Sequence, residues 1–325
     1  MRNYFKKTIN SVLMIFVCWS LSVSVASAEK VNIGVPNWTG AKAVAHLLQA
    51  VIVDRMGGQA ELVPGNNASI FQAMDAGKGD IDVHPDVWLP NQQSFTKKYV
   101  DGAGTVALNS HPYEGNQGFC VSKNFAKKHN ITAIEDFTRP EVAADMDSDG
   151  NGKGEIWIGA PGWASANVNE VKVRDYRLLP FLEAIRAEES VKTARVKDSI
   201  AKSEGYAFYC YKPHAIWYMF DIEMLKEPKF DPNKYTMYQP SDSDNWYNKS
   251  HVETKDALKR VQIAFSKSLR KRSPAIYEFF ENFSLDANDV SGFAYEISGQ
   301  GKEASVVARE WMKKNSSRVD SWLGL

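Results

Sequence analysis

Apolar residues in the first third of the chain recur with two alternating periods. Short apolar runs at residues 30–35, 61–63 and 80–83 have the length and composition of buried strands. Between them, residues 43–56 and 68–76 carry apolar side chains at helical spacing, and the first of these helices is expected to stop before a pair of glycines. Strands that alternate with helices predict a mostly parallel sheet flanked by helices, with ligands at the carboxyl ends of the strands.

The alternation continues through the rest of the chain. The run at residues 118–121 predicts a strand that leaves the first domain, and residues 205–211 predict a hydrophobic strand of a second domain. Helical spacing follows at residues 180–196, 248–270 and 304–322. The apolar face of the last segment is typical of packing against a core.

The amino terminus has the pattern of an export signal. Three basic residues precede an apolar run at residues 12–25, which ends at Ala26-Ser27-Ala28. This order predicts a secretory signal peptide over residues 1–28, cleaved after Ala28. The apolar run is short for a membrane span, so we expect an exported protein without a membrane anchor.

Removal of the signal leaves 297 residues (325 − 28), which is more than one compact core usually holds. Two domains are therefore expected. The strand at residues 118–121 leaves the first domain, and the chain is expected to return to it from about Tyr238. The first domain would then combine residues 29–116 with residues 239–325, and the second would comprise residues 117–238.

Charge and cysteine content limit the choice of partners. The chain has 39 basic and 39 acidic residues, and the signal contains three basic and no acidic ones, which leaves 36 − 39 = −3. A near-neutral mature chain argues against a nucleic-acid partner, which requires a basic face. Cys120 and Cys210 remain after cleavage; they could pair, but buried unpaired thiols are the favoured interpretation, since two cysteines make no disulfide framework.

Aromatic side chains follow several of the predicted strands. Trp38 and Trp88 come directly after strands of the first domain, and Tyr211 and Trp217 follow the strand at residues 205–211. Each could be a core residue. Their repeated position at the ligand-binding edge of a sheet favours contact with a ligand.

A tight turn at residues 159–166 offers both halves of a site for a zwitterion. Proline and two glycines surround Trp163, and the small residues Ala164 and Ser165 stand where a helix is expected to start. Free backbone N–H groups there can bind an anionic group, and the indole face can bind a cation. A turn whose tryptophan only fills a core is the alternative.

Glu114 stands beside the expected hinge between the domains. A carboxylate at this place could face a ligand cation or, when protonated, donate a hydrogen bond to a ligand oxygen. An exposed loop acid is the simpler interpretation.

A glycine-rich loop before the turn alternates oxygen ligands at the spacing of a calcium loop. Its first, third, fifth, seventh and ninth positions are Asp147, Asp149, Asn151, the carbonyl of Lys153, and Glu155. The twelfth position is Ile158, so the bidentate acid of such loops is missing. Either a weakened, structural Ca²⁺ site or an ordinary turn fits this pattern.

The sequence lacks the motifs of the common hydrolase, zinc-protease and phosphate-binding sites. Several segments instead resemble the substrate-binding proteins of glycine betaine/proline betaine ABC transporters. They are the turn that contains Trp163, the segment Asp86-Val-Trp88-Leu-Pro90, the segment from Tyr209 to His214, and the closing helix near residues 308–323. The resemblance extends over essentially the whole mature chain.

The resemblance implies an α/β, two-lobed periplasmic binding protein fold of type II, with mixed sheets flanked by helices and joined by crossover strands. It implies a monomeric periplasmic receptor that captures a small zwitterionic or cationic methylated amine and delivers it to an inner-membrane ABC permease. Neither enzymatic activity nor a cofactor is expected, apart from the candidate structural Ca²⁺.

By motif, the aromatic box of the family would fall on Trp88, Trp163 and Tyr211, and its carboxylate-binding amides on Ala164 and Ser165. The family commonly has tryptophan where Tyr211 stands. Trp38, Glu114 and Trp217 do not follow from the betaine pattern, so trimethylamine N-oxide or a choline-type ligand competes with glycine betaine. An exported enzyme acting on a methylated amine is the remote alternative.

Overall fold

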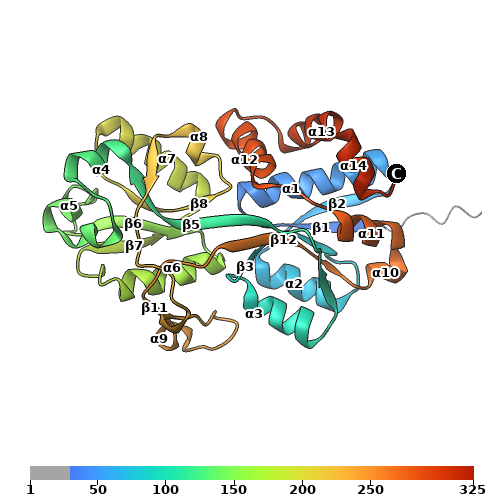
Figure 1. The fold of residues 1–325 in the computed structure, drawn as a ribbon, viewed down its shortest axis with the longest axis horizontal. Coiled ribbons are helices and arrows are strands. Elements are labelled where there is room, and N and C mark those ends of the chain that lie inside the picture. The colour runs from blue at the N-terminus through green and yellow to red at the C-terminus, as the bar shows by residue number, and fades with distance from the viewer. Residues whose placement is uncertain (1–29) are drawn as a thin grey trace, which may run out of the picture.

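The computed structural model describes residues 30–325 and has two α/β lobes side by side (Figure 1). The expected fold class is therefore confirmed. The predicted signal peptide, residues 1–28, lies outside the described residues. Within residues 30–325, no helix combines the length and apolar character needed to cross a membrane.

Lobe I is built on three parallel strands. Strand β1 (Val31–Val35) lies between β2 (Ala60–Pro64) and β3 (Val83–Leu89). Helix α1 (Thr39–Ala50) packs on this sheet and against the closing helix α13 (Ala304–Lys314). The predicted strand, helix and strand at residues 30–63 are confirmed, because a buried apolar run and an amphipathic helix each leave a clear pattern in the sequence.

The other elements of lobe I follow in chain order to the carboxyl terminus. They are η1 (Val51–Arg55), α2 (Asn67–Ala76), α3 (Gln93–Thr96), η2 (Lys97–Gly102), β4 (Val106–Leu108), α10 (Leu269–Arg272), α11 (Pro274–Asn282), α12 (Ala287–Ala294), η5 (Tyr295–Gly299) and α14 (Ser316–Trp322).

Two long strands join the lobes. Strands β5 (Tyr113–Ser122) and β12 (Lys259–Ser266) pair antiparallel through their first residues and extend into opposite lobes, as Figure 1 shows at the centre of the molecule. Through this pair the sheets become continuous, in the order β2-β1-β3-β12-β5-β8-β6-β7. The crossing strands leave a cleft between the lobes, which is where the candidate site lies.

Lobe II repeats the parallel arrangement. Strand β6 (Gly154–Gly159) pairs in parallel with β7 (Leu182–Arg186) and β8 (Ala207–Lys212), and β8 pairs antiparallel with β5. The remaining elements are α4 (Lys123–His129), η3 (Ile134–Thr138), α5 (Pro140–Ala144), α6 (Ala164–Asp175), α7 (Glu189–Lys202), α8 (Ile216–Met219), β9 (Ile222–Met224), η4 (Pro232–Lys234), β10 (Tyr235–Thr236), α9 (Trp246–Lys249) and β11 (His251–Val252).

Three predictions about elements are wrong. The sheet is mixed, as the family resemblance implied, and not mostly parallel, as the local pattern predicted, because β12 pairs antiparallel with β3, β4 and β5. Residues 248–270 are not mostly helical, since they contain β12, which is buried along almost its whole length and so shows no alternation that would mark a strand. Residues 180–196 divide into β7 and the first half of α7.

The return to lobe I comes later than about Tyr238. The hairpin of β10 and β11 packs with Val252 against Val168 and Val171 of α6, a helix of lobe II. The chain enters lobe I only with β12. A short two-stranded hairpin has little apolar periodicity of its own, so its lobe is decided by the helix it covers.

Cys120 and Cys210 form a disulfide, and the prediction of two unpaired thiols is wrong. The bond joins β5 to β8, with the two Cα atoms 5.8 Å apart. The strands are neighbours only in the folded sheet, and the cysteines are 90 residues apart in sequence. Proximity that arises from strand pairing cannot be inferred from two isolated cysteines.

Candidate ligand-binding site

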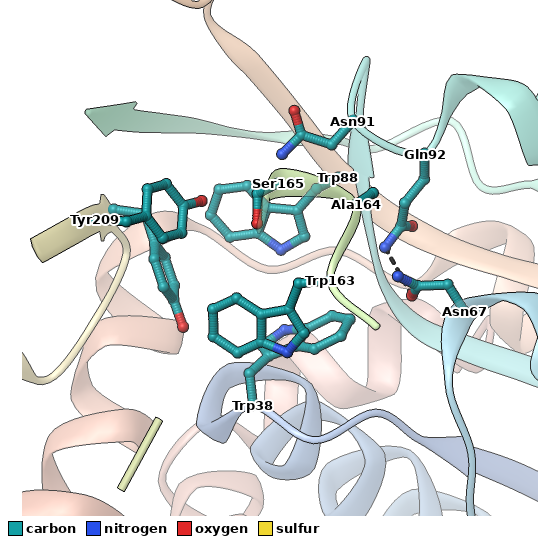
Figure 2. A pocket seen from close by; sticks show the side chains of 10 residues that line it. Trp38, Asn67, Trp88, Asn91, Gln92, Trp163, Ala164, Ser165 and Tyr209 are labelled. Carbon is teal, nitrogen blue, oxygen red and sulfur yellow. Dashed lines mark hydrogen bonds between the residues drawn. The ribbon is translucent and has the colours of Figure 1, made fainter. Parts of the chain in front are cut away.

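A cavity between the lobes collects most of the side chains that the sequence analysis singled out (Figure 2). It encloses about 340 Å³ of space, part of it open to solvent. Its lining residues come from both lobes: Trp38, Asn67, Trp88, Asn91, Gln92, Trp163, Ala164, Ser165, Tyr209 and Tyr211.

Aromatic rings form one side of this cavity. The rings of Trp38 and Trp163 lie edge to face with centroids 5.8 Å apart, and the ring of Trp88 lies edge to face with Tyr211 at 5.4 Å. Trp163 and Tyr211 are also nearly perpendicular, at 6.0 Å. Perpendicular rings present faces in several directions around one space, which is the geometry of a cage for a quaternary ammonium group.

Local structure brings each ring to the cavity. Trp38 follows β1 and is the residue before α1, and Trp163 stands at the same place before α6. Trp88 lies inside β3 rather than after it. On β8, Tyr209 and Tyr211 are two residues apart and share the face that lines the cavity, which leaves Cys210 on the other face for the disulfide.

Two glycines permit the close packing around the rings. A Cβ atom at Gly115 of β5 would lie 2.7 Å from the Trp88 ring, and one at Gly159 would lie 2.9 Å from the Cβ of Ala166. Gly159 also has φ of 131°, a conformation that side chains disfavour. The turn before Trp163 therefore depends on glycine.

A buried carboxylate holds the lobe I rings in place. Asp86 Oδ2 accepts hydrogen bonds from the indole Nε1 of Trp38 at 2.6 Å and of Trp88 at 2.9 Å. Its Oδ1 accepts from the hydroxyl of Tyr113 at 2.6 Å. Burial raises the pKa of Asp86, while these three hydrogen bonds act in the opposite direction. In the sequence, Asp86 stood out only as the first residue of the segment that contains Trp88, and no role was predicted for it.

A second carboxylate connects the lobes beside the cage. Glu189, the first residue of α7, accepts hydrogen bonds from Tyr211 and His214 on one oxygen. Its other oxygen accepts from the backbone N–H of Thr39 at 3.0 Å and from the Thr39 hydroxyl at 2.9 Å. Because Thr39 belongs to lobe I, Glu189 bonds a ring of the cage and the opposite lobe at once.

The start of α6 supplies backbone donors to the cavity. Trp163 precedes the helix without a side-chain cap, and its indole Nε1 donates to Asn37 Oδ1 at 2.8 Å. Among the described residues, no acceptor takes the backbone N–H groups of Ala164 and Ser165, which line the cavity. A twelve-residue helix that begins with free N–H groups is suited to bind an anionic group.

Carboxamide side chains line the side of the cavity opposite Tyr209, as Figure 2 shows for Asn67 and Gln92. Asn67 Oδ1 accepts a hydrogen bond from Gln92 at 2.9 Å. Asn91 is held between Lys259, which donates to its oxygen at 2.8 Å, and Gln117, which accepts from its nitrogen at 3.0 Å. Sequence analysis missed these amides and Tyr209. Asn91 and Gln92 follow the motif that contains Trp88, and Tyr209 lies two residues before Tyr211, so proximity in sequence was the available signal.

Two predicted site residues lie outside the cavity. Glu114 is exposed at the start of β5, where the register places it opposite Arg260 of β12. Trp217 is half-buried next to the cage, donates its Nε1 to the Tyr211 carbonyl at 2.8 Å, and has the ammonium of Lys212 4.3 Å from its ring centre. The hinge strand points Glu114 to solvent, so the structure does not place it among the residues that discriminate between solutes.

The glycine-rich loop brings its acids together. Ligand oxygens of Asp147, Asp149 and Glu155 all lie within 4.8 Å of one another. Hydrogen bonds from backbone N–H groups, foremost that of Gly152, lower the pKa of Asp147. Ile158 is buried in β6 and offers no oxygen side chain. Glu183 of β7 contacts the loop, because its Oε2 accepts a hydrogen bond from Asn151 Nδ2 at 2.8 Å. Clustered oxygens of this kind are the ligands that a hard cation such as Ca²⁺ prefers.

Curated relatives of the chain are binding proteins of the bacterial periplasm. The glycine betaine/proline betaine-binding periplasmic protein of Salmonella typhimurium is 20% identical over 219 residues, which is 64% of this chain and 63% of that protein. The protein of the same description from Escherichia coli is 19% identical over 211 residues, with the same coverage. The match thus spans less than two thirds of the length of these relatives.

Solved structures with the same fold cover more of the chain. Lactococcal OpuAC, in a closed conformation with glycine betaine, has a TM-score of 0.70 at 20% identity and covers 91% of this chain and 99% of its own. An ABC-transporter choline-binding protein in complex with choline has a TM-score of 0.70 at 16% identity and covers 92% of each chain.

A family model described as the substrate binding domain of ABC-type glycine betaine transport system matches residues 29–314. This span contains lobe II, lobe I as far as the end of α13, both crossing strands and every residue that lines the cavity. The chain belongs to the family of substrate-binding domains of ABC-type glycine betaine transport systems.

Proposed function

We propose that the protein is a periplasmic receptor of an ABC importer that captures a small methylated ammonium compound, glycine betaine or a relative, between its lobes. The observation that carries this proposal is the cage of Trp38, Trp88, Trp163 and Tyr211, which faces one cavity from both lobes. A quaternary ammonium group has no N–H to donate, so aromatic faces are the groups that can bind it with selectivity.

The two ends of the cavity suit the two ends of a zwitterion. The cage takes the methylated cation, and the backbone N–H groups of Ala164 and Ser165 at the start of α6 take the anionic group. Four desolvated cation–π contacts contribute roughly 2–8 kcal/mol before the cost of association is subtracted. Micromolar binding requires about 8 kcal/mol, so the anionic end and lobe closure must contribute as well.

Choline and trimethylamine N-oxide are the second candidates. Both carry the methylated cation, and both lack the carboxylate that the start of α6 would bind. The hydroxyl of choline is neutral, and the N-oxide offers the same donors one charged oxygen where a carboxylate offers two. We expect affinity to rank glycine betaine first on this ground.

Titration calorimetry of the mature protein with glycine betaine, proline betaine, choline, carnitine and trimethylamine N-oxide tests the proposal. At least one ligand should bind with micromolar affinity or better and be recovered chemically unchanged. Absence of binding by all five would contradict the receptor assignment, and a chemically altered ligand would favour an exported enzyme.

The cage residues make the test specific. We expect Trp88→Ala and Trp163→Ala each to weaken binding by about 1–3 kcal/mol, because each loses a cation–π contact and apolar burial. Trp322→Phe, a substitution at a buried tryptophan of α14 that does not line the cavity, is the control. Unchanged affinity in both alanine variants would remove these rings from the site.

A periplasmic location and an inner-membrane permease as partner belong to the same proposal. The named periplasmic relatives and the family description support them. Expression of the full chain in a bacterium, followed by osmotic release of the periplasm and amino-terminal sequencing, tests the location. The released protein should begin at Glu29.

A further inference from the structure

Asp86 is a buried carboxylate directly behind the cage. Its three hydrogen-bond partners are the indoles of Trp38 and Trp88 and the hydroxyl of Tyr113, all neutral donors. The carboxylate is 1% exposed and does not itself line the cavity. The charge of Asp86 therefore acts on a ligand in the cavity across the two indole rings and not by direct contact.

The absence of a basic partner sets Asp86 apart from other buried carboxylates among the described residues. Asp82 pairs with Arg272 and Glu189 with His214, while Asp256 lies between Lys172 and Lys259. No ion pair of the described residues includes Asp86. The nearest imidazole, His84, accepts a hydrogen bond from the Asp86 backbone N–H on Nδ1, which leaves that ring neutral.

A buried anion that lacks a counter-charge is costly unless something compensates it. Three charge-assisted hydrogen bonds compensate part of this cost. The remainder is a negative potential at the cage, which a cation in the cavity would neutralise. In an environment of low dielectric, this potential is felt strongly across the width of an indole.

We propose that Asp86 determines the selectivity of the cage for a positive charge, acting as the ligand's counter-ion through the indoles of Trp38 and Trp88. Donation of each indole N–H to a carboxylate polarises the ring and makes its face more negative, which strengthens its attraction for a cation. Asp86 thereby also fixes the orientation of both rings. This inference rests on the proposed function, since it concerns the ligand of the same cavity.

The charge of Asp86 can be removed while its hydrogen bonds are kept. In Asp86→Asn the amide oxygen can accept from both indoles, and the amide nitrogen can donate to the Tyr113 oxygen. The variant therefore separates the charge from the positioning of the rings. Melting curves establish that it is folded.

The probes are glycine betaine and 3,3-dimethylbutanoate, in which carbon replaces the quaternary nitrogen. Both keep the carboxylate and the three methyl groups. The dissociation constant of the isostere divided by that of glycine betaine therefore reports recognition of the cationic charge alone. Calorimetry measures the first ligand, and ligand-observed NMR reaches the weak affinity of the second. We expect Asp86→Asn to raise the dissociation constant of glycine betaine by about tenfold or more and to change that of the carbon isostere by less than about threefold.

A ratio that changes by less than threefold in folded Asp86→Asn would overturn the inference and leave Asp86 an anchor for the rings. Failure of wild-type protein to bind any methylated ammonium ligand would instead contradict the proposed function. The two failures are thus distinct.

A second pair of variants answers the case in which Asp86→Asn does not fold. Trp88→Phe and Trp163→Phe each exchange an indole for a phenyl face, but only Trp88 donates its N–H to Asp86, since Trp163 donates to the neutral Asn37. We expect the ratio of the two dissociation constants to fall at least threefold further in Trp88→Phe than in Trp163→Phe. Equal falls in both variants would overturn it.

Discussion

Two hydrogen bonds give His84 a single tautomer beneath the cavity. Its Nδ1 accepts from the Asp86 backbone N–H at 3.2 Å, so Nε2 carries the proton and donates to Asn67 Oδ1 at 2.9 Å. Asn67 in turn lines the cavity. A buried neutral histidine thus supports one of the carboxamides that sequence analysis missed.

Burial lowers the pKa of His84 from 6.5 to about 3, which predicts a loss of stability in acid. Below pH 6.5 the unfolded chain binds a proton at this residue and the folded chain does not, so stability is lost as pH falls from 6.5 toward 3. At pH 5 we expect this residue to account for roughly 2 kcal/mol of the loss in unfolding free energy.

Urea unfolding of wild type and His84→Gln at pH 7 and pH 5 measures this effect. Glutamine can still donate a hydrogen bond to Asn67 but does not titrate. The variant should therefore lose roughly 2 kcal/mol less unfolding free energy than the wild type between pH 7 and pH 5. Equal losses in the two proteins would show that His84 is not the residue responsible.

At the same scale, the sequence pointed to rings that line the cavity but not to the residues that hold them in place. Trp38, Trp88, Trp163 and Tyr211 were found because large aromatic residues beside turns and strand ends are conspicuous in a sequence. Asp86 and Glu189 were not, because an acidic residue is usually exposed and only its partners identify a buried one.

Strands β5 and β8 are joined by the disulfide of Cys120 and Cys210 at the base of the cage. Both cysteines are fully buried, and β8 also carries Tyr209 and Tyr211 on its opposite face. The bond closes a loop of 90 residues, a span for which cross-linking restricts the unfolded chain strongly.

The double variant Cys120→Ala/Cys210→Ala should lose about 2–5 kcal/mol of unfolding free energy, measured by guanidinium denaturation. The wild-type protein treated with reductant in denaturant and then refolded is the control for the thiol form. A variant as stable as the oxidised wild type would contradict a stabilising bond.

The loop before β6 stays a candidate cation site, and we propose that it binds Ca²⁺ weakly and structurally. Its clustered oxygens lie in lobe II, and none belongs to a residue that lines the cavity. Millimolar Ca²⁺ should therefore raise the melting temperature by a few degrees and leave ligand affinity unchanged.

Asp149→Asn should abolish that shift, while Asp101→Asn, a change at an exposed acid of lobe I, should not. An unchanged melting temperature in Ca²⁺ and in chelator, with no metal by elemental analysis, would contradict a cation site and leave an ordinary turn.

At the scale of the whole molecule, hydrogen bonds join the two lobes beside the cavity. The Thr39 hydroxyl of lobe I bonds Glu189 of lobe II at 2.9 Å, next to the hydrogen bond that Glu189 accepts from Tyr211. A hydrogen bond to a charged group contributes about 1.5–3 kcal/mol, and partial exposure of Thr39 places this one at the lower end. Part of this energy is gained only when the lobes meet.

We expect Thr39→Ala to weaken ligand binding by about 1–2 kcal/mol, mainly through faster release, and to change the melting temperature of the ligand-free protein little. Stopped-flow dissociation measures the release rate. Thr138→Ala removes a hydroxyl bond within lobe II and is the matched control. Identical release rates in wild type and Thr39→Ala would exclude a role in closure.

The sequence alone determined the alternation of strands and helices, the turn at Gly159 and Gly162, and four of the rings that form the cage. Each of these depends on neighbours in the chain: apolar period, glycine conformation, and a ring next to a turn. Such features survive any change in the arrangement of distant segments.

Only the tertiary structure decided the partners of those residues. Trp38 meets Asp86 across 48 residues, Thr39 meets Glu189 across 150, and Cys120 meets Cys210 across 90. The pairing of β12 with β3 and β5 likewise made the centre of the sheet antiparallel, where the local pattern predicted mostly parallel strands, and β5 presents Glu114 to solvent. Contacts of this kind follow from how strands order themselves in a sheet, a choice made by the burial of the whole molecule and left unmarked in any local stretch of sequence.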